Sequence, residues 1–193
     1  MDALWARLRS KIKALGAEGE LGPPARDESL VAAEALMGVG LPGDLRESLS
    51  IHNGDAIRKV EGGWQSDGPF ADLELLSLAA MVSEWQTWMD DTRDGGLVPV
   101  AEGPVHAMFW NPKWIPITVL GGSSWHHCVD LDPPTSGTFG QVIEITDDDG
   151  LRRVVAPSFR AFLEGILRDL DADRYELDDD RRLVARETAD PDR

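Results

Sequence analysis

The segment from Trp114 to Thr146, WIPITVLGGSSWHHCVDLDPPTSGTFGQVIEIT, decides the fold of this 193-residue chain. It contains three runs rich in β-branched and aromatic residues, at 114–120, 124–132 and 141–146, with Gly-Gly and Pro-Pro turn sequences between them. Short gaps favour antiparallel neighbours, because a parallel crossover needs about a dozen residues or more. We therefore expect an antiparallel sheet, with an edge or a bulge at Pro116, which has no N–H for a strand ladder.

The sequence on both sides of this segment predicts further strands and several helices. Shorter β-rich runs lie at 73–76, 105–110 and 151–155. Apolar residues at helical spacing predict a first helix at 4–15, ended by Gly16, and a last one at 159–170, with Pro157 in its first turn. Three more helices are expected to begin at Asp27 or Ser29, after Leu41-Pro42, and after Ser77.

These elements define a fold class and a division of the chain. We expect an α+β fold with N-terminal helices, a mainly antiparallel sheet of about five or six strands, and a C-terminal helix packed on the sheet. Residues 1–26 are expected to form an N-terminal helix and a linker, and residues 27–171 the domain itself. Residues 172–193 are expected to be a charged C-terminal tail.

The net charge of −16 is concentrated in the middle of the sequence. Residues 61–149 carry fifteen acidic and two basic side chains, a net charge of −13. Such a field repels nucleic acid and anionic membranes and attracts cationic partners. An acidic surface also improves solubility, so the alternative that this charge serves only solubility stays open.

The remaining composition bears on the cellular compartment. A single cysteine, Cys128, excludes an internal disulfide bond, and residues 1–10 show no apolar core of a secretory signal. No apolar run approaches the roughly 20 residues of a membrane span. We therefore expect a cytoplasmic protein.

The sequence contains no recognisable catalytic or metal-binding motif. On a strand, His126 and Cys128 face one way and His127 the other, whereas zinc needs three or four converging ligands. The G-x-G-x-x-G sequence at 38–43 follows a predicted helix, not the strand of a dinucleotide site. We expect no catalytic residue, no metal and no cofactor; an enzyme that uses Cys128 and a histidine is the least favoured alternative.

Several segments, in the same order along the chain, resemble one known family. They are Leu41-Pro42 with Asp44-Leu45, Leu49 to His52-Asn53-Gly54, Trp114–Ile117, Gly121-Gly122, Cys128–Pro133, Gly140–Ile143, Val155-Ala156, Ser158-Phe159 and Phe162-Leu163. Over about residues 30–170 the chain resembles the SUKH superfamily, also described as the Smi/Knr cell-wall-assembly regulator type. Gly43, where members commonly have an acid, and Pro157, which weakens the expected cap at Ser158, depart from the pattern.

The resemblance implies the fold described above and a binding function without catalytic residues. Bacterial members typically serve as immunity proteins that neutralise toxins, often nucleases, and fungal relatives are regulatory interaction proteins of cell-wall synthesis. Our leading hypothesis is an immunity protein that binds a cognate toxin with a basic surface. The alternative is an intracellular regulatory scaffold or small-ligand-binding domain. Either leaves the oligomeric state open.

Candidate partner-binding residues are acids outside the matching motifs and two tryptophans, since aromatic anchors dominate interfaces. They are Asp90, Asp91, Asp94, Trp110, Trp114, Asp147, Asp148 and Asp149. The last three acids precede Gly150 and lack the alternating spacing of a calcium loop, so we expect them in a hairpin turn. Core packing competes with the anchor role for both tryptophans.

Overall fold

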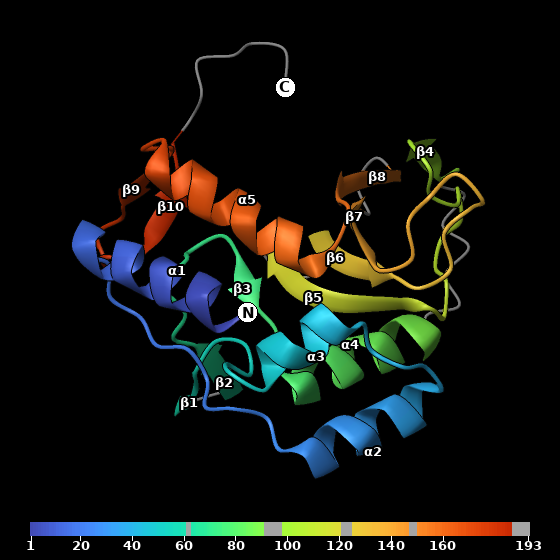
Figure 1. The fold of residues 1–193 in the computed structure, drawn as a ribbon, viewed down its shortest axis with the longest axis horizontal. Coiled ribbons are helices and arrows are strands. Elements are labelled where there is room, and N and C mark those ends of the chain that lie inside the picture. The colour runs from blue at the N-terminus through green and yellow to red at the C-terminus, as the bar shows by residue number, and fades with distance from the viewer. Residues whose placement is uncertain (61–62, 91–97, 121–124, 147–149, 187–193) are drawn as a thin grey trace.

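The computed structural model describes residues 1–60, 63–90, 98–120, 125–146 and 150–186 (Figure 1). Within these residues the helices are α1 (Asp2–Leu15), α2 (Asp27–Met37), α3 (Gly43–Leu49), α4 (Leu78–Asp90) and α5 (Phe159–Asp171). The main sheet contains β3 (Glu74–Leu75), β4 (Val100–Glu102), β5 (Trp114–Leu120), β6 (Trp125–Asp130), β7 (Gln141–Thr146) and β8 (Leu151–Ala156). Two hairpins pair β1 (Ile57–Val60) with β2 (Gly63–Ser66), and β9 (Tyr175–Leu177) with β10 (Leu183–Ala185).

The main sheet has the strand order β3-β5-β6-β7-β8-β4. Every neighbouring pair is antiparallel except β4 and β8, which run parallel at one edge. The predicted α+β fold class is therefore confirmed. The register between β5 and β6 shifts between Pro116 and Thr118, so Pro116 lies at a bulge in an inner strand, as its missing N–H requires.

Side chains alternate across this sheet and supply two separate cores. On one face Ile115 and Val129 join a large core to which all five helices contribute. On the other face Trp114 and Cys128 pack with Val105 in a smaller core. The alternation explains why nearly every position of β6 and β7 is buried although only some of them are apolar.

The last helix packs as predicted. α5 contacts β7 and β8 and lies beside α1, the blue helix next to it in Figure 1. Its cap forms although Pro157 precedes it: the Ser158 hydroxyl accepts the N–H of Ala161 at 3.2 Å. At the other end of the chain, Gly16 closes α1 with a φ of 79°, as expected from the sequence.

The expected cap of the second helix is wrong. The N-cap of α2 is Arg26, which makes no side-chain cap hydrogen bond. The carboxylate of Asp27 is instead paired with the guanidinium of Arg46 on α3, and Ser29 lies inside the helix. Two acids in its first turn still favour this helix through the positive end of the helix dipole.

The strand expected at 105–110 is also wrong. This segment is irregular and covers the small core. A buried side chain takes the place of a neighbouring strand, because Arg152 donates to the carbonyl oxygens of Met108 and Phe109 at 3.2 and 2.9 Å. The strand that does form, β4, ends before the segment, and Gly103 follows it with a φ of 91°.

Two hairpins lie where the sequence predicted none. β1–β2 forms in a Gly-rich stretch, and β9–β10 forms in the region expected to be a tail. Leu183 of β10 is 1% exposed, and its backbone bonds to the carbonyl of Pro69 at 2.8 Å and the N–H of Ala71 at 2.9 Å. The second hairpin is thus attached to the rest of the fold, while the domain boundary after residue 171 stays a prediction.

In the part of the chain that the structure describes, no helix combines the length and the apolar character needed to cross a membrane.

Candidate functional site

The structure describes only one of the six acids that the sequence suggests for partner binding. Asp90 is exposed at the C-terminal end of α4. Asp91 and Asp94, as well as Asp147, Asp148 and Asp149, lie outside the described residues. Their proposed role in partner binding therefore stays a prediction.

The two tryptophans behave differently. Trp114 is 0% exposed, and its indole N–H donates to Asp130 at 3.1 Å. A side chain in that position cannot contact a partner, so Trp114 is a core residue and its selection as an anchor was wrong. Trp110 is half-buried and stacks on Trp88 of α4, with ring centroids 5.0 Å apart and planes at 11°.

The His52-Asn53-Gly54 motif joins the N-terminal helices to the sheet edge. The side-chain oxygen of Asn53 accepts the N–H of Leu78 at 2.7 Å and thereby caps α4. Gly54 has a φ of 71°, and a Cβ there would come within 2.5 Å of the backbone of Leu76 and Ser77. Only glycine satisfies both the backbone conformation and the close approach.

Asp55 follows this motif and is 2% exposed. One carboxylate oxygen accepts the N–H of Leu75 at 3.0 Å and the hydroxyl of Ser66 at 3.2 Å. The other oxygen has no hydrogen-bond partner among the described residues. Burial, with a smaller contribution from the charge of Glu74, raises the pKa of Asp55 to about 7.

The Asp55 carboxylate supports the end of the β1–β2 hairpin. A Cβ at Gly68 would lie 2.1 Å from it, so the backbone after β2 packs directly against the carboxylate. The Ser66 hydroxyl also accepts the N–H of Gly68 at 3.2 Å. These contacts position the segment that forms the floor of an adjacent pocket.

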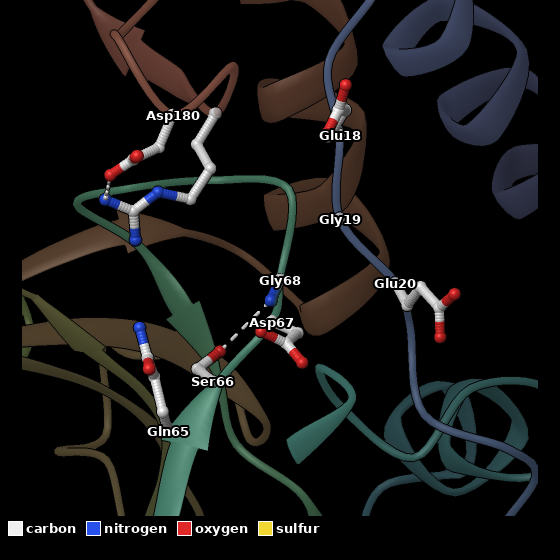
Figure 2. Close-up of a pocket in the computed structure, with 9 residues that line it drawn as sticks. Glu18, Gly19, Glu20, Gln65, Ser66, Asp67, Gly68 and Asp180 are labelled. Atoms are coloured by element: carbon white, nitrogen blue, oxygen red, sulfur yellow. Dashed lines mark hydrogen bonds and ion pairs between the residues drawn. The ribbon is translucent and has the colours of Figure 1, made fainter. Parts of the chain in front are cut away.

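We call this hollow the acidic pocket; its volume is about 540 Å³ (Figure 2). Its charged lining residues are Glu18, Glu20, Asp67, Asp180 and Arg182. Figure 2 shows the segment with Glu18 and Glu20 on one side, the chain from β2 to Gly68 in the middle, and Asp180 opposite. Three segments distant in sequence therefore build it: the connection after α1, the end of β2, and the β9–β10 turn.

Among its described lining residues, the pocket has four carboxylates and one guanidinium. That guanidinium, of Arg182, is already paired with Asp178 at 3.3 Å and Asp180 at 3.8 Å. Glu18 pairs with Arg181 at 3.1 Å, whereas Glu20 has no ion-pair partner in the described part of the chain. An excess of negative charge in a concave site suits the binding of an ammonium or guanidinium group.

Cys128 and His127, two side chains with nucleophilic or metal-binding potential, are both buried. Cys128 is fully buried, and burial raises the pKa of its thiol, which disfavours the reactive thiolate. Burial lowers the pKa of His127 to about 4, and its ring bonds to the Thr118 hydroxyl at 2.8 Å. Across the described ranges no three His, Cys, Asp or Glu side chains are grouped to hold a metal ion.

Sequence reasoning missed the acidic pocket. Of its four carboxylates only Asp67 belongs to the strongly acidic stretch 61–149. Tyr175 and Leu177 alternate with the charged residues Arg174, Glu176 and Asp178, which is a signal for a strand beyond residue 171. Nothing in the local pattern indicated that the β9–β10 hairpin packs against residues 69–71.

A model of the SMI1 / KNR4 family (SUKH-1) matches residues 24–165 of the chain. The chain is 27% identical to the glucan synthesis regulatory protein of Neurospora crassa, over 83% of this chain and 36% of that protein. It is 27% identical to the cell wall biosynthesis/cell cycle regulator smi1 of Schizosaccharomyces pombe, over 72% of this chain and 30% of the relative. It is 23% identical to the cell wall assembly regulator SMI1 of Saccharomyces cerevisiae, over 83% and 38%.

The chain thus spans about a third of the length of these relatives, between 30% and 38%. The family match includes the His52-Asn53-Gly54 motif, the sheet and the floor of the acidic pocket. It does not include Glu18, Glu20, Asp180 or Arg182, which form the pocket walls.

Proposed function

Since this chain belongs to the SMI1/KNR4 family (SUKH-1), we propose that it is a non-catalytic protein-binding domain whose partner docks a basic segment in the acidic pocket. The single observation that carries the proposal is the charge of the described lining of this pocket, where four carboxylates face one guanidinium that is already paired. The net charge of −16 supports it, because an acidic protein attracts cationic partners over a long range.

A concave site makes such an interaction stronger than an ordinary surface ion pair. Exposed ion pairs contribute about 0–1 kcal/mol, because solvent screens them and long side chains lose freedom. A lysine or arginine that enters the pocket meets several carboxylates at once and is partly removed from solvent, which lowers the local dielectric screening. Glu20, without an ion-pair partner in the described residues, is the carboxylate most available to it.

The names of the similar proteins favour a regulatory role. All three describe regulators of glucan synthesis, cell-wall biosynthesis or cell-wall assembly, and none names an enzyme. We propose that this chain likewise acts in a regulatory assembly, in the cytoplasm.

A second candidate is an immunity protein, in which the basic segment belongs to a toxin. The net charge of −13 over residues 61–149 favours it. A nuclease toxin must hold phosphates with lysine and arginine, and an acidic protein can occupy that groove. Co-expression with a toxin encoded beside this gene decides between the two: rescue of growth supports immunity, and unrelieved growth arrest leaves the regulatory role.

Charge reversal at one pocket residue tests the shared part of both proposals. Glu20→Lys should weaken the binding of a fluorescein-labelled hexa-arginine peptide about five- to tenfold, measured by fluorescence anisotropy. Glu164→Lys, on the exposed side of α5, makes the same change in net charge outside the pocket and should change affinity less than about twofold. Equal losses in the two variants would mean that the peptide senses only overall charge, and the pocket proposal would be wrong.

A further inference from the structure

A second pocket lies next to the acidic one and has the opposite character. We call it the basic pocket; its volume is about 410 Å³. Arg9, Lys13, His52 and one carboxylate, Glu20, supply its polar lining, while Leu21 and Pro69 supply apolar surface. It shares Gly19 and Glu20 with the acidic pocket, so one short segment of chain forms a wall of both.

The cations of the basic pocket are not neutralised within the described structure. Arg7 and Lys11 on the same helix pair with Asp171 at 3.8 and 3.2 Å. Arg9 and Lys13 have no carboxylate partner among the described residues, although the chain carries 35 acidic side chains. One helix thus presents a paired row of cations to α5 and an unpaired row to the pocket.

The guanidinium of Arg9 is held in place by the family motif. An arginine only donates, so its Nη1 donates to Nε2 of His52 at 2.9 Å. The other ring nitrogen, Nδ1, then carries the hydrogen and donates to the carbonyl of Gly22 at 3.3 Å. The indole of Trp5 packs edge-on against the His52 ring, with centroids 5.1 Å apart.

The same surroundings keep His52 neutral. Burial, and to a lesser degree the charge of Arg9, lowers the pKa of His52, while the bond to Gly22 opposes this shift. A neutral imidazole can accept the hydrogen bond of Arg9, whereas an imidazolium cannot. This bond favours one position of the exposed guanidinium before any ligand arrives, which reduces the entropy lost on binding.

We propose that the basic pocket is a second subsite, which binds an anionic group of the same partner segment that docks in the acidic pocket. This inference rests on the proposed function and specifies its partner: an extended segment of mixed charge, with a basic side chain and a carboxylate or phosphate group on opposite sides of the Gly19–Glu20 wall. The apolar surface beside Leu21 and Pro69 accommodates the aliphatic part of the anionic side chain.

The two adjacent charges also exclude a polyanion. A nucleic acid that reached Arg9 and Lys13 would bring further phosphates toward the four carboxylates of the acidic pocket. A partner segment that carries one anionic group next to one basic group is attracted by both pockets. Charge alternation over a short distance is thus the feature that this surface selects.

The test uses fluorescein-labelled peptides with a Gly-Ser background. One carries an Arg-Lys pair alone; the others add either a glutamate or a phosphoserine, separated from that pair by about two to eight glycines, a range that spans the distance between neighbouring pockets. Overall attraction to a protein of charge −16 predicts that the peptide with the basic pair alone binds most tightly. The second subsite predicts the reverse: at the best spacing, a mixed-charge peptide binds about fivefold more tightly.

Two variants of α1 provide the matched comparison. Lys13→Gln should remove the preference for the mixed-charge peptide, whereas Lys11→Gln, with the same change in net charge but outside the pocket, should keep it. Circular dichroism confirms that both variants are folded. The glutamate and phosphoserine peptides distinguish a carboxylate-bearing from a phosphate-bearing partner, and a preference for either supports the subsite.

The two proposals fail in different ways. If the peptide with the basic pair alone binds at least as tightly as every mixed-charge peptide, yet loses affinity in Glu20→Lys, the second subsite is wrong and the acidic pocket remains. If no peptide distinguishes the wild-type protein from Glu20→Lys, the acidic pocket is wrong and the second subsite is wrong with it.

Discussion

Two buried aspartates, one in the sheet and one beneath the acidic pocket, are treated differently by the fold. Asp130 in β6 is 0% exposed and accepts hydrogen bonds at both oxygens, from the Trp114 indole, the N–H of Asp132 and the Gln141 amide at 3.1, 2.9 and 3.0 Å. Asp55 is 2% exposed, yet one of its oxygens has no partner in the described residues. Burial raises the pKa of both.

This difference separates a structural region from a responsive one. Around Asp130 two of the three donors lie on neighbouring strands and the third closely follows β6, so the charge is satisfied and the site is rigid. Around Asp55 the carboxylate is only half satisfied, and protonation near neutral pH relieves the cost of burying its charge. The sheet should therefore respond to mutation mainly through packing, and the pocket floor through charge and pH.

The largest effect is expected in the sheet, at Trp114. Trp114→Ala removes a fully buried indole and one of the hydrogen bonds to Asp130, and should lower the free energy of unfolding by about 3–5 kcal/mol in urea titrations. Trp110→Ala, at the half-buried ring stacked on Trp88, should cost about half as much. Equal losses of unfolding free energy in the two variants would contradict the finding that, of the two tryptophans, only Trp114 is fully buried in the smaller core.

The next effect is the pH dependence caused by Asp55. Its pKa rises from an ordinary 3.8 to about 7 on folding, so the folded protein binds a proton that the unfolded chain has released. Asp55 therefore lowers stability as pH rises from about 4 to about 7, and the loss levels off above the folded-state pKa. A shift of this size corresponds to about 2–4 kcal/mol.

Asp55→Asn should remove this contribution, because an amide does not titrate. The variant should therefore become more stable relative to the wild-type protein as pH rises from about 4 to about 8, measured by urea unfolding at each pH. A difference in unfolding free energy that stays constant over this range would show that Asp55 is ionised in the folded protein throughout.

The regions also differ in how far the sequence predicts them. β5 to β8 follow from local alternation and turn residues, and Pro116 marks its bulge by its own chemistry. The irregular segment 105–110 has the composition of a strand, and only the position of Arg152 reveals where its carbonyls bond. The acidic pocket forms only where three segments distant in sequence meet. No local pattern in its Gly-rich part or in its charged part indicates that these segments pack together.

A smaller effect is expected at the floor of the acidic pocket. Gly68→Ala places a Cβ 2.1 Å from the Asp55 carboxylate, which has to move and weaken its bonds to Ser66 and Leu75. We expect a loss of about 1–3 kcal/mol in unfolding free energy. Gly40→Ala is the control, because nothing lies within 4 Å of a Cβ there, and it should be close to neutral. A neutral Gly68→Ala would mean that the carboxylate is not packed against this backbone.

The smallest effects concern the caps that begin α4 and α5, one in each region. Ser158 caps α5 from the adjacent position at 3.2 Å, whereas Asn53 caps α4 from 25 residues away at 2.7 Å. Ser158→Ala should cost about 1 kcal/mol, the usual value of a local cap. Asn53→Ala should cost somewhat more, up to about 2 kcal/mol, because the same bond also joins the motif around His52 to the sheet edge.

Hydrogen exchange distinguishes the two variants. Ser158→Ala should speed exchange only in the first turn of α5. Asn53→Ala should speed exchange in α4 and also at residues 54–56, where the N–H groups of Asp55 and Ala56 bond to the carbonyls of Leu75 and Glu20. If exchange after Asn53→Ala changes only in α4, the motif is a cap and nothing more, and the pocket floor does not depend on it.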